Sequence, residues 1–289
     1  MAEQQDLQTA CFQFVSTLAQ DLSRDDFDLP GYPAVVIELQ RALGDAETSV
    51  QDVVKLINGE PALAARLVKL ANSAAFSHNH REVCEPRAAV TQLGFNVVRS
   101  TASAFAVKQM KHQDWLKPVI PQLEQINRRS ISVASICAGV GLHIDGVRPD
   151  EALATGLFHQ IGNLYLLTRA HQEDLVAGNP EWEPISDDWH PTIARAIIES
   201  WGMSEGVGIA AENQNVLLGD GDVEGLSVLG RILAAAKLYN LVREPEQHTL
   251  DREQVEIALG KTLINGVTFV DLAARHQEDI DTFRNSISG

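Results

Sequence analysis

Cysteine and long apolar runs are both scarce in this sequence. Its three cysteines, Cys11, Cys84 and Cys137, lie far apart in 289 residues and form no C-x-x-C pair, which excludes a disulfide framework and is typical of a reducing cytosol. No apolar run is long enough to span a bilayer, and the first residues lack the basic start and apolar core of a signal peptide. These absences predict a cytoplasmic protein.

Positive charge is also in short supply. Lysine and arginine together number 23 against 39 aspartate and glutamate residues, so the formal net charge is −16. The acidic residues are spread along the chain. Nucleic-acid affinity depends on clustered lysine and arginine, and anionic membranes attract basic segments. The sequence therefore predicts neither a nucleic-acid partner nor a membrane partner.

Helix-forming patterns fill almost the whole chain. The hydrophobic fraction of 45% and the charged fraction of 21% are ordinary for a globular protein, and the length suffices for one large domain or two packed lobes. Apolar residues recur at helical spacing in segment after segment, and no alternating strand run with a hairpin turn stands out. We therefore expect an all-α fold of two packed helical lobes.

Local signals place several of the expected helices. Gly94 ends a short helix, Pro149 begins the helix that carries His159, and His190–Pro191 begins a further helix. Near the end of the chain, residues 251–260 and 267–285 have the pattern of two amphipathic helices.

Five ordered segments resemble the HD-related output domain (HDOD) family of bacterial signal-transduction proteins. They are "LPGYPAVVIELQRAL", "VVKLINGEPALAARLVKLANSAAF", "PRAAVTQLGFNVVRSTASAFAV", "ALATGLFHQIGNLYLL" and "HPTIARAIIESWGM". The last two are similar to the family's Gly-Leu-Leu-His-Asp-Ile-Gly segment and to its His-x-x-x-Gly-x-x-Leu-x-x-x-Trp helix.

The resemblance divides the chain into three parts. Residues 1–28 are expected to form an N-terminal helix and residues 242–289 a C-terminal helical extension. Between them, the HDOD domain of residues 29–241 comprises an N-terminal helical lobe, 29–112, and an HD-like helical bundle, 113–241. No receiver or output enzyme is attached, which indicates a stand-alone form of the domain.

The resemblance also implies a distant relation to HD-domain metal-dependent phosphohydrolases. Those enzymes hold a divalent metal ion with a first histidine, a His-Asp pair and a later aspartate. In this sequence the first position matches Arg129, the pair is His159–Gln160 and the later position matches Lys237. Gln160 keeps an oxygen but brings no charge for a hard cation, and two cationic side chains would repel a metal ion. We expect a degenerate site with no catalytic residue, no metal and no cofactor.

Two buried-type histidines are the vestigial metal candidates. His159 lies on an apolar helix and is typical of a core imidazole, while His190 precedes a proline, as a capping or packing residue does. Together they could hold a metal only if Glu212 or Asp187 joined them. Elsewhere, His276 with Glu278 or Asp279 has the pattern of a charged helix face, and His78 with His80 that of a solvated loop.

The sequence thus favours a non-catalytic signal-transduction domain that acts through protein–protein contacts. The partner would be a separate chain, such as a kinase, a response regulator or a cyclic-nucleotide enzyme, and the terminal helices are candidates for partner docking or homodimer formation. One alternative is a metal-dependent phosphohydrolase with a rearranged centre. Of these hypotheses, it alone requires a divalent metal ion. Another is a metal-free nucleotide or anion sensor that uses Arg128, Arg129 and Lys237.

Overall fold

Helices form nearly all of the structure. The computed structural model describes residues 9–11, 13–18, 20, 29–77, 82–176, 179, 182–218, 223, 225–243 and 252–288. The α-helices with defined bounds are α2 (Ala34–Gly44), α3 (Val50–Asn58), α4 (Pro61–Ala71), α5 (Pro86–Met110), α6 (Ile120–Gly141), α7 (Pro149–Phe158), α8 (Ile161–Gln172), α9 (Trp182–Ser200), α10 (Glu205–Glu212), α11 (Val228–Arg243), α12 (Arg252–Lys261), α13 (Phe269–Arg275) and α14 (Gln277–Ser288). Two 3₁₀ helices, η1 (Asp114–Val119) and η2 (Val216–Leu218), and a hairpin of β1 (Leu263–Ile264) and β2 (Val267–Thr268) complete the elements. The expected all-α fold is confirmed.

Some expectations fall partly outside the described residues. The described positions between 9 and 20 are helical, in agreement with the N-terminal helix, while the rest of residues 1–28 and the His78–His80 segment lie outside the description. No helix among the described residues is both long and apolar enough to cross a membrane.

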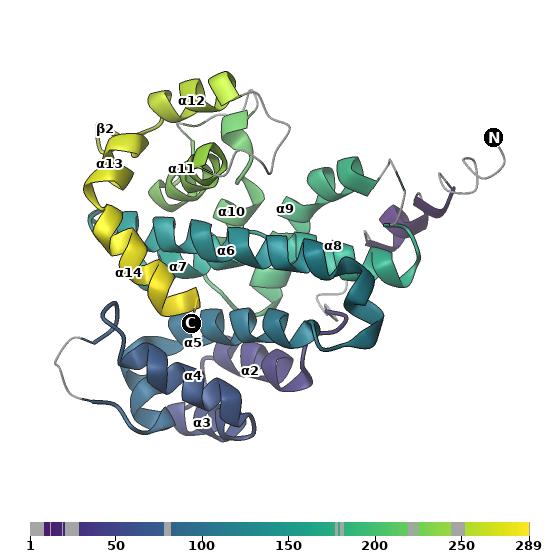
Figure 1. The fold of residues 1–289 in the computed structure, drawn as a ribbon, viewed down its shortest axis with the longest axis vertical. Helices are drawn as coiled ribbons and strands as arrows, with labels where there is room; N and C mark the ends of the chain where they lie inside the picture. The colour runs from purple at the N-terminus through teal and green to yellow at the C-terminus, as the bar shows by residue number, and fades with distance from the viewer. Residues whose placement is uncertain are drawn as a thin grey trace.

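The N-terminal lobe packs α2, α3 and α4 against α5, at the bottom of the molecule in Figure 1. Ser49 and Asp52 form a capping box at the start of α3, with Ser49 Oγ accepting from the Asp52 amide. Gly94 interrupts α5 with φ 75° and ψ 165°, so the helix predicted to stop there does stop, and a second helical stretch continues to Met110. Glycine alone adopts such a backbone conformation without strain.

The second lobe is arranged around the long helix α6, which crosses the middle of Figure 1. Helices α7, α11 and α14 pack directly on α6, and α8, α9 and α10 form a neighbouring layer. Figure 1 shows α14 descending from α13 along α6 to the edge of α5. The C-terminal helices are therefore packed on the bundle.

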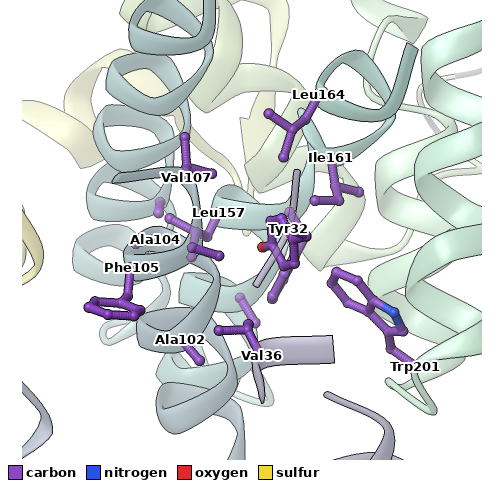
Figure 2. Packing of buried hydrophobic residues seen from close by; sticks show 14 of the residues in the cluster. Tyr32, Val36, Ala102, Ala104, Phe105, Val107, Leu157, Ile161, Leu164 and Trp201 are labelled. Carbon is purple, nitrogen blue, oxygen red and sulfur yellow. The ribbon is translucent and has the colours of Figure 1, made fainter. Parts of the chain in front are cut away.

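One hydrophobic core runs through both lobes, and a second lies between α6 and helices α11–α14. At the junction of the lobes, Tyr32 stacks on Trp201 with ring centroids 6.1 Å apart, and Figure 2 shows both rings beside Leu157 and Ile161. The Tyr32 hydroxyl donates to Ser103 Oγ over 2.8 Å. Burial of these apolar surfaces joins the two lobes.

Helix α9 begins earlier than the sequence predicts. Its first residue is Trp182, so Pro191 lies inside the helix and His190–Pro191 does not start it. Trp182 and Trp189 pack against the main core, and Trp182 also meets the ring of Phe14 edge-on, with centroids 6.3 Å apart. Tertiary packing thus extends the helix past the proline that would ordinarily limit it.

The expectation of one helix over residues 267–285 is wrong. Residues 267–268 pair with 263–264 across a turn in which Asn265 and Gly266 both have positive φ, the pattern of the two-residue Asn-Gly hairpin turn. Each strand has only two residues, which is too short to produce an alternating pattern. A further break at His276 separates α13 from α14.

Close backbone contact between helices yields the first prediction. A Cβ atom added to Gly162 of α8 would lie 2.0 Å from the carbonyl oxygen of His190, whereas one added to Gly206 of α10 meets nothing within 4 Å. We expect Gly162→Ala to lower the free energy of unfolding by about 3 kcal/mol, measured by urea denaturation. The control Gly206→Ala should leave it unchanged or slightly higher. Equal stability of the two variants would contradict the packing of α8 on α9.

Candidate functional site

The four residues matched to the HD ligand positions and His190 come from five helices or their ends. Arg129 lies on α6, His159 caps the end of α7, and Gln160 caps the start of α8. His190 and Lys237 come from α9 and α11. The charges of Lys237 and Arg129 both act on His159, and Lys237 also acts on His190. The fold therefore brings together side chains that are up to 108 positions apart in the sequence.

His159 is held as a neutral imidazole. Its side chain is buried, and Nδ1 lies 2.6 Å from the carbonyl oxygen of Gly156, so Nδ1 carries the proton that is donated in this contact. Burial, together with the positive charge of Lys237, lowers the pKa of His159 to about 3. The imidazole is consequently uncharged at neutral pH, as expected for a core histidine.

The amide of Gln160 belongs to a side-chain network between α8 and α9. Asn163 Nδ2 donates to Gln160 Oε1 over 2.7 Å, and Ser186 Oγ donates to Asn163 Oδ1 over 2.8 Å. Gln160 itself is 5% exposed. Its oxygen thus already accepts a hydrogen bond within the protein, and it carries no negative charge that would attract an ion.

Lys237 is anchored by neutral amide oxygens. Its Nζ donates to Gln214 Oε1 over 3.1 Å and to Asn215 Oδ1. Gln214 in turn donates from Nε2 to the carbonyl oxygen of His159 over 2.9 Å. Burial lowers the pKa of Lys237 to about 8; the nearby Asp187 opposes this shift and Arg129 adds to it. The ammonium group is therefore still mainly protonated at pH 7.

His190 is a buried histidine with an unused nitrogen. It is 2% exposed, and its Nδ1 has no hydrogen-bond partner. Burial lowers the pKa of His190 well below its ordinary value, with Lys237 and then His159 acting in the same direction. The expected role of a helix start does not apply, because the residue lies within α9.

The two acidic candidates behave differently. Glu212 pairs with Arg195, whose Nη1 lies 2.5 Å from the carboxylate, so Glu212 is engaged elsewhere. Asp187 lies near the centre: burial raises its pKa, while the charges of Lys237 and Arg129 lower it. Arg128 is exposed and its charge acts on Glu124, whereas the charge of Arg129 acts on His159, Asp187 and Lys237.

These residues do not fit the metal ion that HD phosphohydrolases hold. A metal site needs at least three ligand atoms close together. Among the described residues, His143, His276 and Asp279 have ligand atoms within 4.8 Å of one another. His159, His190 and Asp187 do not form such a group. In their surroundings, an ammonium and a guanidinium group supply positive charge that a divalent ion would have to overcome.

Sequence reasoning missed two features. Gln214 and Asn215 are polar residues in a turn after α10, and nothing in their spacing pointed to Lys237. His143 also escaped notice: His276 with Asp279 was interpreted as a charged helix face, and nothing in the sequence linked this pair to His143, more than 130 positions earlier.

The comparisons with known proteins decide the family. The sequence model of the HDOD domain matches residues 29–215. The chain belongs to the HDOD family. A solved structure from Shewanella amazonensis SB2B, provisionally named as a metal-dependent phosphohydrolase, is 23% identical, with a TM-score of 0.67 and coverage of 96% of this chain and 99% of its own. One from Marinobacter aquaeolei VT8, provisionally named as a signal transduction protein, is 20% identical, with a TM-score of 0.50 and coverage of 95% and 65%.

The match to a curated protein covers a smaller share of both chains than the structural matches do. An uncharacterised protein of Treponema pallidum (strain Nichols) is 25% identical over 215 residues, which make up 70% of this chain and 40% of that protein. This chain therefore spans about two fifths of the length of that relative. The HDOD match ends before α11, so the place of Lys237 in the centre rests on the structure.

The half-buried Lys237 gives a prediction about pH. Its pKa is about 8 in the folded protein against an ordinary value of 10.5, so between these pH values the unfolded chain binds more protons. The free energy of unfolding should therefore rise with pH across this window. We expect Lys237→Met to remove this rise, measured by urea denaturation at pH 7.5–10, and the exposed Lys261→Met to keep it. If the free energy of unfolding changed with pH in the same way in the wild type and in Lys237→Met, the ammonium group of Lys237 would not be shielded from water.

Proposed function

We propose that this HDOD protein is a non-catalytic signalling domain that works through contacts with other proteins. The observation that carries the proposal is the placement of Lys237 and Arg129 beside His159, at positions where HD phosphohydrolases are expected to hold a metal with histidine and aspartate. The two carboxylates that offset the charge of a divalent ion in an active centre are matched here by the amide of Gln160 and the ammonium of Lys237, and the first histidine is matched by Arg129.

The electrostatics of this centre support the proposal. A buried or half-buried cation is stabilised only when hydrogen bonds replace its water, and Gln214 and Asn215 do this for the ammonium of Lys237. A divalent ion in the same space would be repelled by Lys237 and Arg129 over short distances in a medium of low dielectric constant. Without the ion, no activated water is available for attack at phosphorus.

The C-terminal part of the chain supports a role in protein contact. Most of the large hydrophobic side chains that are exposed among the described residues belong to this part or pack near it, namely Leu142, Ile257, Leu263 and Val270. Exposed apolar groups of this size are the kind that partner surfaces cover. A kinase, a response regulator, a cyclic-nucleotide enzyme or a second copy of this chain would supply such a surface.

The proposal predicts that the purified, tag-free protein does not hydrolyse phosphoesters. We expect no turnover of bis(p-nitrophenyl) phosphate above background with Mn²⁺, Ni²⁺, Fe²⁺ or Zn²⁺, because the centre lacks the charge to hold an ion. The triple variant Arg129→His, Gln160→Asp, Lys237→Asp restores the expected ligand set and should gain a metal ion, detected by elemental analysis.

The decisive contrast lies between the wild type and His159→Ala. Turnover by the wild type that disappears in His159→Ala would overturn the proposal in favour of a phosphohydrolase with a rearranged centre. Metal that remains bound in His159→Ala belongs to another site and leaves the proposal intact.

A second candidate function is a metal-free anion sensor. The observation in its favour is that Arg129 lies close enough to Lys237 to lower the pKa of that side chain, so two cations converge on one space, and arginine and lysine bind phosphate groups without an ion. The hydrogen bonds of Lys237 to two amide oxygens count against it, because an anion would have to compete with them.

Calorimetry with inorganic pyrophosphate in EDTA tests the sensor. Under this second candidate, binding is lost in Arg129→Ala and kept in the matched control Arg128→Ala, whose side chain is exposed on the same helix. Binding that is equal in both variants, or no binding by the wild type, would remove the candidate.

A further inference from the structure

We propose that His143, His276 and Asp279 form a binding site for a zinc-like divalent ion that fastens the C-terminal helix α14 to α6. The three side chains offer two imidazole nitrogens and a carboxylate oxygen, all within 4.8 Å of one another. None of the residues of this site belongs to the positions matched to the HD ligands. The site is therefore independent of the proposed function.

The three residues come from three separate turns of the chain. His143 follows the end of α6, His276 lies between α13 and α14, and Asp279 is in the first turn of α14. His143 Nε2 is 2.7 Å from Asp279 Oδ2, and the rings of His143 and His276 stack with centroids 3.6 Å apart. Ligands brought together from distant segments are typical of an ion that ties those segments to one another.

The backbone around the site is firmly placed. The amide of His276 donates to the carbonyl of Leu272, and the carbonyl of His276 accepts from the amide of Ile280, so His276 is fixed by the helices on both sides. A Cβ added to Gly139 of α6 would lie 2.8 Å from the backbone nitrogen of Ile280. The two helices α6 and α14 therefore cross closely about one turn from His143. This contact fixes the relative positions of the three ligand residues.

The ligand set selects the class of ion. Two imidazoles with one carboxylate suit Zn²⁺, Co²⁺ or Ni²⁺, whereas Ca²⁺ and Mg²⁺ prefer oxygen ligands alone. Ligand atoms around a tetrahedral zinc ion lie about 3–3.5 Å apart, which follows from bond lengths of about 2.0–2.2 Å. His143 and Asp279 have side chains 36% and 39% exposed, so water can fill a fourth position and both can rotate to close around the ion.

The local charges are compatible with an ion. The cluster holds one carboxylate beside two imidazoles, and a neutral imidazole is the form that binds a metal. The stacked rings must tilt for both nitrogens to face one ion, a rotation that the exposure of His143 permits. The carboxylate of Asp279 supplies the negative charge that the HD centre lacks.

The position of α14 gives the ion a structural consequence. At its far end, Arg66 Nη2 donates to the carbonyl of Ile287 over 2.7 Å, and Lys108 Nζ donates to that of Ser288 over 3.1 Å. Phe283 meets Phe76 edge to face, with centroids 5.8 Å apart. Helix α14 therefore connects the bundle to the N-terminal lobe, as its course in Figure 1 shows. An ion at its first turn would make this connection depend on metal.

The helix also closes a hollow between the lobes. Ser286 and Ile287 of α14 line a small hollow together with Arg66, Ser100 and Leu153. The hydroxyl of Ser100 is buried there without a hydrogen-bond partner. Loosening α14 would open this hollow to solvent, so the ion would control access to a surface shared by both lobes.

The test uses the full, tag-free chain with Co²⁺ and Zn²⁺ as probes. We expect one Co²⁺ per chain, with a visible absorption spectrum of nitrogen and oxygen coordination, and displacement of it by Zn²⁺. His143→Gln, His276→Gln and Asp279→Asn should each weaken Zn²⁺ binding at least about tenfold, because each removes a ligand. In hydrogen exchange, Zn²⁺ should slow the amides of α14 in the wild type and have no such effect in His276→Gln.

Two matched controls make the result specific. His112→Gln changes an exposed histidine outside the site and should bind Zn²⁺ as the wild type does. His159→Gln changes the HD centre and should also keep binding. Affinity retained within about threefold in all three ligand variants, or loss of binding in His159→Gln instead, would overturn the proposal. The latter result would also count against the proposed function, whereas the former would not, so the two failures are distinguishable.

Discussion

Close approach between helices is the constraint on which the structure depends. A Cβ added to Gly156 of α7 would lie 2.4 Å from Ala134 Cα of α6. A Cβ added to Gly162 would likewise collide with α9, and one added to Gly139 would collide with α14. Helices can come this near only where one of them has no side chain. The contact at Gly156 fixes the end of α7, and hence the direction of His159. Dispersion and apolar burial over the same surfaces then stabilise the bundle.

The buried centre built on this packing is polar and carries positive charge. Helices α6, α7 and α11 contact one another, and Arg129 and Lys237 bring two cationic side chains close to His159. Amide oxygens of Gln214 and Asn215 take over the stabilisation of Lys237. Burial lowers the pKa of both His159 and His190, and the positive charge of Lys237, which these uncharged amides do not neutralise, acts in the same direction.

The C-terminal helices carry more of the organisation than their place outside the HDOD match suggests. They form the second hydrophobic core with α6 and α11, and α14 reaches the N-terminal lobe through Arg66 and Lys108. A displacement of α14 would therefore change its contacts with both lobes, because packed helices move as units.

The sequence by itself determined the helical class, the capping box at Ser49 and the helix end at Gly94, because these follow from side-chain periodicity and local backbone preference. The assignment of residues to the HD positions, through motifs in a fixed order, stays a prediction. The Asn265–Gly266 hairpin was missed, because its strands are too short to show a pattern. Only the tertiary structure decided the extent of α9, the anchoring of Lys237 and the meeting of His143 with His276. Each of these depends on contacts between distant segments, which the free energy of packing selects and no local pattern encodes.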